Sequence, residues 1–140
     1  MKRAVLFGML LCAFGGSVNL SPAADDKSEK KGAAPYVHCV VFRMKKDAAK
    51  DAVESAIADC HKLLAKIPSV RSVRAGRPVA KGTPDVPKME YDFALLVLVD
   101  DDAGLEAYLK HPLHLQFVAK HGPAFDAEKL QVFDFLNQSK

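Results

Sequence analysis

The sequence has almost no net charge in the part expected to fold. It has 20 Lys and Arg against 17 Asp and Glu, and without residues 1–23, whose only charged residues are Lys2 and Arg3, the ratio is 18 to 17. A chain whose basic and acidic residues are this evenly balanced lacks the excess of positive charge that is typical of nucleic-acid-binding proteins. Lys45, Lys46 and Lys50 do cluster, but they are typical of the solvated start of a helix. We therefore expect no nucleic-acid partner.

The sequence also lacks an apolar run long enough to span a membrane. The uncharged run at residues 4–14 is shorter than the ~20 residues that a membrane-spanning helix needs. It follows Lys2 and Arg3 and precedes the small residues 21–23, which is the pattern of a secretory signal peptide. We predict a signal peptide over residues 1–23, an extracytoplasmic (periplasmic or secreted) protein, and no stable membrane insertion after cleavage. The alternative is an N-terminal anchor that is retained.

Large apolar side chains are missing from residues 24–35, which include the segment DDKSEKKGAA. Such a segment cannot bury a core, so it is expected to be a disordered linker. No internal repeat is visible, and residues 36–136 have the size of one small domain.

The remaining pattern alternates between strand and helix signals. β-Branched and aromatic residues predict strands at 36–43, 70–79, 91–99 and 130–136. Helical spacing of apolar residues predicts one helix over 47–66, capped by Asp47, and a second helical region over 103–121 that Pro112 interrupts. Residues 80–90 contain one Gly and two Pro and are expected to form a loop. The order β-α-β-β-α-β predicts an α+β, ferredoxin-like fold with helices on one face of a four-stranded antiparallel sheet.

Both faces of the predicted sheet are apolar. Along the strand at 91–99, Phe93, Leu95, Val97 and Val99 share one face, while Ala94, Leu96 and Leu98 share the other. Val37, Cys39 and Val41 repeat this pattern in the first strand. An apolar second face needs a cover, and the simplest is the same face of a second copy. We predict a homodimeric α+β barrel; the alternatives are a different protein partner or a third layer built by the loop at 80–90.

Two cysteines remain outside the expected signal peptide, and they are predicted to be free. Cys39 lies with Val37 and Val41 on the dimer side, whereas Cys60 lies on the apolar stripe of the first helix, which packs on the opposite face. A disulfide needs Cα atoms within roughly 7 Å and side chains that point toward each other.

Three histidines and a tyrosine are the candidates for chemistry. Tyr108 and His111 are three residues apart on a helix, Pro112 turns the chain, and His114 begins the next segment. His38 faces the helices from the first strand. We predict a pocket for a small apolar ligand that contains His38, Tyr108, His111 and His114. Its walls are predicted to be apolar: Val40, Phe42, Phe93, Leu95, Val97 and Phe117.

An acid–base hypothesis, a structural alternative and a candidate metal site follow from these residues. His114 can act as a general base near neutral pH, while the Tyr108 hydroxyl hydrogen-bonds a developing enolate oxygen. The structural alternative is that the His-Pro turn caps a helix and the tyrosine ring packs in the core. A metal site would use His111 and His114 with His38 or His121, but no paired-cysteine motif accompanies them, so no metal or cofactor is expected. His61 and His121 are expected to be exposed.

These residues match a known pattern. The chain resembles the stress-responsive A/B barrel (Dabb) domain family over nearly all of residues 36–135. The marks of the resemblance are HCVVFRMK at 38–45, IPSV at 67–70, Gly76, YDFAL at 91–95, LEAYL at 105–109, HPLH at 111–114, Phe117 and FDF at 133–135.

The resemblance implies a ferredoxin-like domain that forms a dimeric α+β barrel. One plant branch of the family is a polyketide cyclase that performs an intramolecular aldol condensation. Its base is the second histidine of the His-Pro-x-His element, assisted by the preceding tyrosine, and these match His114 and Tyr108; its cavity histidine matches His38. A further histidine of that branch is Phe93 here.

The sequence leads to three functional hypotheses. The first is an exported, dimeric barrel with a hydrophobic pocket for a small molecule and a stress-related role. The second is a cyclase-like acid–base enzyme with His114 as base and Tyr108 assisting. The third is a non-catalytic structural or partner-binding barrel with a filled core.

Overall fold

The computed structural model describes residues 36–86 and 88–138, so the expected signal peptide and linker lie outside the described residues. The elements, in chain order, are β1 (Tyr36–Phe42), α1 (Ala52–Lys62), η1 (Leu64–Lys66), β2 (Val70–Gly76), β3 (Phe93–Val99), α2 (Asp102–Lys110), α3 (Pro112–His121), η2 (Gly122–Ala124) and β4 (Gln131–Leu136).

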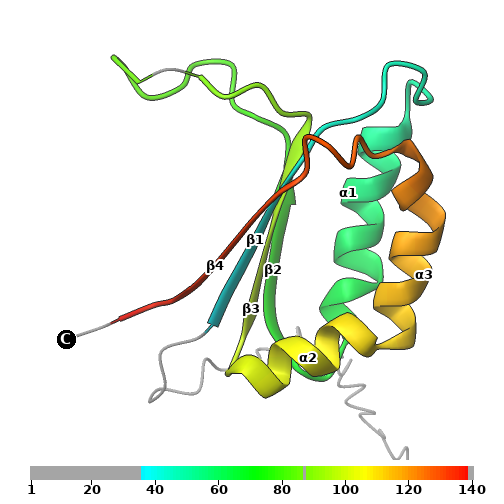
Figure 1. Cartoon of the computed structure of the whole chain (residues 1–140), viewed down its shortest axis with the longest axis vertical. Helices are drawn as coiled ribbons and strands as arrows, with labels where there is room; N and C mark the ends of the chain where they lie inside the picture. Colours follow the sequence, from blue (N-terminus) through cyan, green and yellow to red (C-terminus); the bar gives the residue numbers. More distant parts are fainter. Residues whose placement is uncertain (1–35, 87, 139–140) are drawn as a thin grey trace, which may run out of the picture.

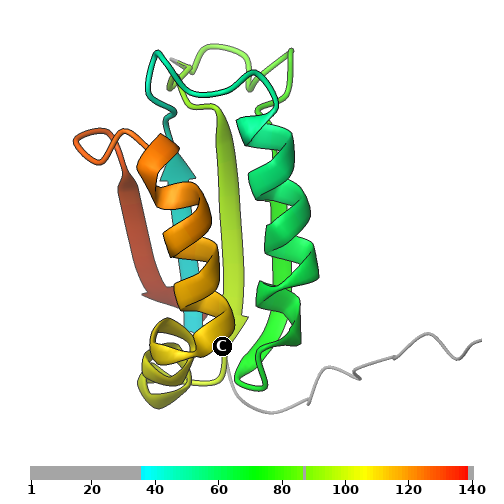
Figure 2. The same cartoon turned by 90° about the vertical axis from the view of Figure 1, so that its right-hand side faces the viewer.

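The strands form one antiparallel sheet in the order β2-β3-β1-β4, and the helices lie on one face of it (Figure 1). In Figure 2, α1 lies in front of β2, α3 lies in front of β1, and β3 is seen between the two helices. No helix covers β4 in that view. This arrangement confirms the predicted ferredoxin-like fold.

The core lies between the sheet and the helices. In β3, Phe93, Leu95, Val97 and Val99 are each at most 2% exposed, while the alternate residues are half-buried. From α1, Val53, Ala56 and Cys60 complete the core at helical spacing. Burial of these apolar surfaces supplies the main favourable free energy of folding, at about 25 cal/mol per Å².

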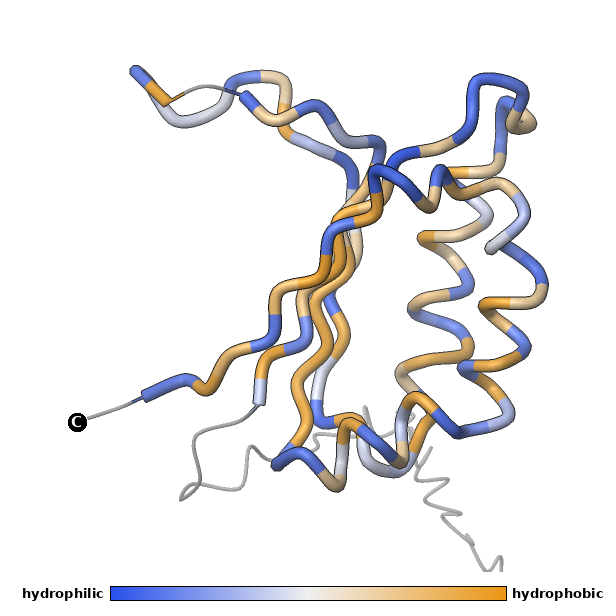
Figure 3. The backbone as a smooth tube through the Cα atoms, in the orientation of Figure 1, coloured by the Kyte–Doolittle hydropathy of each residue, from blue (hydrophilic) through white to orange (hydrophobic). Residues whose placement is uncertain are grey.

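The second face of the sheet is open and apolar, as predicted. Cys39, Val41, Leu96 and Leu98 are half-buried there, and the apolar colouring of the strands in Figure 3 continues across the sheet. Phe133 and Phe135 lie on one face of β4 and are about half exposed. Phe133 is the register partner of Cys39 in β1, so both phenylalanines belong to the open face. The loop at 77–92 projects from one end of the sheet rather than lying over this face, so it does not build the third layer (Figure 1).

Several element boundaries differ from the prediction. The first helix begins at Ala52, and Asp51 rather than Asp47 precedes it. Tight turns occupy the residues before it: the Ala48 N–H donates to the Lys45 carbonyl oxygen, and the Ala52 N–H donates to the Ala49 carbonyl oxygen. It ends at Lys62 and continues as the 3₁₀ turn η1. β2 ends at Gly76 because Pro78, just beyond, has no N–H to donate to a neighbouring strand.

Neither cysteine of the described residues forms a disulfide, which confirms the predicted free thiols. Cys60 is fully buried, and burial raises the pKa of its thiol to about 12. Cys39 is half-buried on the open face, where partial burial raises the pKa of its thiol as well. Among the helices of residues 36–86 and 88–138, none is long and apolar enough to cross a membrane.

Candidate acid–base site

Tyr108 lies at the centre of the candidate site. The Asp101 carboxylate accepts a hydrogen bond from the Gly104 N–H (2.8 Å), which caps α2 and fixes its start. Two turns later Tyr108 is the buried residue of this helix, at 1% exposure. Its ring meets His38 of β1 edge-on, with centroids 5.8 Å apart. Burial, reinforced by the nearby Cys60 thiol, raises the pKa of the Tyr108 hydroxyl above its ordinary value, so the hydroxyl stays protonated and can act as a donor.

His111 forms the turn that brings His114 to Tyr108. The residue before a proline is disfavoured in the helical region, so α2 ends at His111 and Pro112 opens α3. The His111 Nδ1 accepts the Leu113 N–H (3.2 Å) and so caps α3. The structure thus places His111 in the capping role of the structural alternative.

His114 presents a defined tautomer to the site. Its Nδ1 lies 2.9 Å from the Leu109 carbonyl oxygen, which can only accept, so Nδ1 carries the proton and Nε2 has the free lone pair. Its ring contacts Tyr108, with centroids 4.6 Å apart. Burial lowers the pKa of His114, and the positive charge of a protonated His38 acts in the same direction, while the Leu109 hydrogen bond opposes them in part. His114 is therefore a neutral base at neutral pH.

Asp134 completes the site, and the sequence analysis missed it. It lies directly opposite His38 in the β1–β4 register, and its Oδ1 is 2.7 Å from the His38 Nδ1. This contact orients the His38 ring with Nδ1–H toward the carboxylate and Nε2 toward the other side. The sequence did hold a sign of this role: Asp134 is the only charged residue in the strand QVFDFL, and it lies on the face of the strand that points toward the helices.

Three of the four predicted polar residues, His38, Tyr108 and His114, therefore lie together. The predicted apolar walls are all in the hydrophobic core: Val40, Phe42, Phe93, Leu95, Val97 and Phe117. Phe42 and Phe93 stack with centroids 4.3 Å apart, and Phe125, which the sequence analysis did not single out, packs against both. Because these side chains already pack against one another, their contact with a ligand stays a prediction.

Exposed apolar side chains flank the polar residues on two elements. On α3, Leu115 and Val118 are about half exposed, on the side of the helix opposite to Lys120, which faces α1. On β4, Val132 and Leu136 are about half exposed and share the face of Asp134. Apolar surface thus borders the site on α3 and on the strand that no helix covers.

His121 is buried rather than exposed, contrary to the sequence expectation. It is 5% exposed, and its Nε2 lies 2.9 Å from the Asp59 Oδ2, which also accepts from the Lys120 Nζ (2.7 Å). The last turn of α3 packs against α1, so a histidine that appears in the sequence as a helix end lies inside the helix–helix contact. The hydrogen bonds from Lys120 and then His121 hold the pKa of Asp59 below its ordinary value.

We expect Asp59→Ala to lower the free energy of unfolding by about 2 kcal/mol at neutral pH, because it leaves buried His121 without its partner. Since the folded-state pKa of Asp59 is depressed, its contribution is present above the unfolded value near 4 and is lost as the pH falls below that. Urea unfolding of the wild type and of Asp59→Ala at neutral and acidic pH measures this difference in the free energy of unfolding. The control is Lys120→Ala, which removes an exposed partner and should cost less than about 1 kcal/mol. Equal stability of Asp59→Ala and wild type at neutral pH would contradict the assignment.

In the parts of the chain that the structure describes, no three His, Cys, Asp or Glu side chains come together in a way that could hold an ion. His121 lies with Asp59 on the α1 side of α3, whereas His111 caps the other end of that helix.

The fold and the arrangement of these residues can be compared with known proteins. The family profile of the stress-responsive A/B barrel domain (Dabb) matches residues 37–137. The chain belongs to this family. Among curated proteins, nothing matches the chain.

Solved structures of other proteins support the same fold. A dimeric ferredoxin-like protein of unknown function from Thermobifida fusca is 26% identical, covering 75% of this chain and 92% of its own, with a TM-score of 0.63. A Dabb family protein from Mesorhizobium loti is 24% identical, covering 76% and 99%, with a TM-score of 0.60. The hydroxynitrile lyase from Passiflora edulis is 19% identical, covering 78% and 98%, with a TM-score of 0.63. A dimeric ferredoxin-like protein is thus similar to this chain, and the fold also occurs in an enzyme.

Proposed function

We propose that this Dabb protein is an exported homodimer that binds a small, largely apolar carbonyl compound between α3 and β4, where His114 removes a proton from it. The observation that carries the proposal is the hydrogen bond from the His114 Nδ1 to the Leu109 carbonyl oxygen (2.9 Å). It fixes the ring and directs the basic Nε2 away from the helix backbone.

The neighbouring groups suit the removal of a proton next to a carbonyl. The His114 Nε2 takes the proton from carbon, and the electron pair of the C–H bond moves into the carbonyl group to give an enolate. The protonated Tyr108 hydroxyl donates a hydrogen bond to the enolate oxygen, and His38, oriented by Asp134, fixes the polar end of the ligand. Return of the proton from His114 to another carbon of the enolate completes an isomerase-like reaction. Attack of the enolate carbon on a second carbonyl, with the proton passing from His114 to the new alkoxide, completes a cyclase-like aldol reaction.

The ligand is expected to be mostly apolar because of what borders the polar residues. Leu115 and Val118 on one side and Val132 and Leu136 on the other leave apolar surface exposed that a ligand would cover. The fold of the Passiflora hydroxynitrile lyase gives a precedent for a lyase on this scaffold. Removal of a hydroxyl proton from a cyanohydrin would use the same base.

The homodimer is supported by the open face of the sheet. Its half-buried and exposed apolar side chains, which include Cys39, Leu96 and Phe133, need a cover. The dimeric state of the Thermobifida protein shows that a similar domain pairs with itself.

Native mass spectrometry of the protein, purified from a host that exports it, tests this proposal. We expect a dimer that carries one small molecule per chain. The Leu115→Asp and Val132→Asp variants are expected to remain dimeric and to lose the bound mass, because a carboxylate in each apolar row opposes an apolar ligand. A ligand retained by both variants would place binding elsewhere, and a monomer would contradict the dimer.

A further inference from the structure

The long loop at 77–92 is braced at both of its ends. At its start, Arg77 forms an ion pair with Glu54 of α1. At its end, Glu90 accepts from the Arg43 Nη2 (2.9 Å), and the Asp92 Oδ2 accepts from the Met44 N–H (2.7 Å). The loop therefore leaves the sheet in a fixed direction.

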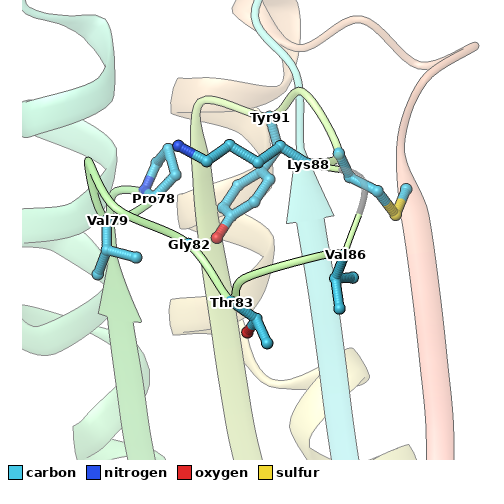
Figure 4. Close-up of a pocket in the computed structure, with 8 residues that line it drawn as sticks. Pro78, Val79, Gly82, Thr83, Val86, Lys88 and Tyr91 are labelled. Carbon is cyan, nitrogen blue, oxygen red and sulfur yellow. The ribbon is translucent and has the colours of Figure 1, made fainter.

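A bond across the loop also holds its middle in shape. The Lys88 Nζ donates to the Ala80 carbonyl oxygen (2.6 Å) from the opposite side of the loop. Gly82 permits this crossing, because a Cβ there would lie 3.2 Å from the Lys88 side chain. The loop curves around a hollow of about 260 Å³, and Figure 4 draws the side chains that line it.

The braced loop presents apolar side chains to solvent. Val79, Val86 and Met89 are 72%, 57% and 59% exposed. They border the hollow together with Pro78 and Tyr91. The charged residues of the loop are three basic ones, Arg77, Lys81 and Lys88, and three acidic ones, Asp85, Glu90 and Asp92. This balance suits neither a nucleic acid nor an anionic membrane surface. A braced frame that exposes three large apolar side chains is typical of a protein contact, since little conformational entropy is lost on binding.

The position of the loop identifies the partner. It projects beyond the end of the sheet on the side opposite to the helices, which is the side of the open face (Figure 1). A partner that covers that face and extends past this end of the sheet would meet the loop as well. We infer that the loop at 77–92 is an arm that binds the second copy of this chain, with the side chains of Val86 and Met89 packed against that copy. This inference rests on the homodimer of the proposed function.

The test compares dimer dissociation constants by sedimentation equilibrium for wild type, Val86→Ser/Met89→Ser and the control Lys81→Ser. Two arms act in each symmetric dimer, so the double variant is expected to raise the dissociation constant about 10- to 100-fold, while Lys81→Ser leaves it within about twofold. A dimeric wild type with an unchanged double variant overturns the arm but leaves the homodimer standing. A monomeric wild type overturns both. Circular dichroism verifies that the variants fold, as expected for substitutions at exposed positions.

Discussion

Replacing His114 with Gln is expected to slow proton abstraction from an activated carbon acid by about 10²- to 10⁴-fold. Gln retains an amide donor for the Leu109 carbonyl oxygen but has no basic nitrogen, so it isolates the loss of the base. A suitable probe is 5-nitrobenzisoxazole, an apolar compound whose ring opens to a coloured phenolate when a base removes its C–H proton. The measurement is kcat/KM for this ring opening at neutral pH.

The pH dependence of the same reaction follows from the environment of His114. The base works only when it is unprotonated, and burial lowers its pKa below the ordinary value near 6.5. The rate should therefore rise with pH through a midpoint below 6.5 and level off at higher pH. Tyr108 stays protonated over this range because burial raises the pKa of its hydroxyl. The rate of the His114→Gln variant should not show this rise between acidic and neutral pH.

The matched control is His61→Gln, which removes an exposed histidine on α1 that faces the Ala75 carbonyl oxygen. It should keep wild-type kcat/KM. A His114→Gln variant that retains the wild-type rate and pH profile would assign the reaction to another group. With this probe, Tyr108→Phe is expected to lower kcat/KM less than His114→Gln does. It removes a hydrogen-bond donor to the developing phenolate oxygen but leaves the base in place.

The second large effect is expected at the open face of the sheet. Leu96→Glu should convert the dimer to a monomer at micromolar concentration, a loss of more than about 10³-fold in association. Leu96 lies opposite Cys39 of β1 and Arg74 of β2, near the middle of that face. A symmetric interface would bury two carboxylates per dimer in a largely apolar contact, and taking each charge out of water costs several kcal/mol even with Arg74 beside it.

Sedimentation velocity measures the dimer, and circular dichroism shows whether the monomer remains folded. The control is Leu115→Glu, which adds the same charge at an exposed leucine on the helix side. It should stay dimeric. If Leu96→Glu is also dimeric, the open face is not the interface, and a different surface joins the copies.

The sequence was sufficient to predict the fold because the relevant signals are local. Alternation along β3 separates Phe93 and Leu95 from Ala94 and Leu96, and this separation alone predicts the covered and the open face. The boundaries were less accurate. Turns at 47–51 depend on backbone bonds such as Ala48 to Lys45, which side-chain periodicity does not report.

The candidate site was predictable only where its residues lie close in the sequence. Tyr108, His111 and His114 fall on two consecutive helices, so helical spacing brought them together. Asp134 is 96 residues from His38, and only the β1–β4 register makes them neighbours. His121 was misplaced for a related reason, because its burial depends on how α3 packs against Asp59 of α1.

The most direct test of the acid–base account is nitrogen-15 NMR of the imidazole rings as a function of pH, with His114→Gln used to assign the signals. The account predicts that His114 titrates below 6.5 and, when neutral, carries its proton on Nδ1 with Nε2 unprotonated. A His114 with its proton on Nε2, or with a pKa above 6.5, would contradict the role of this residue as the base.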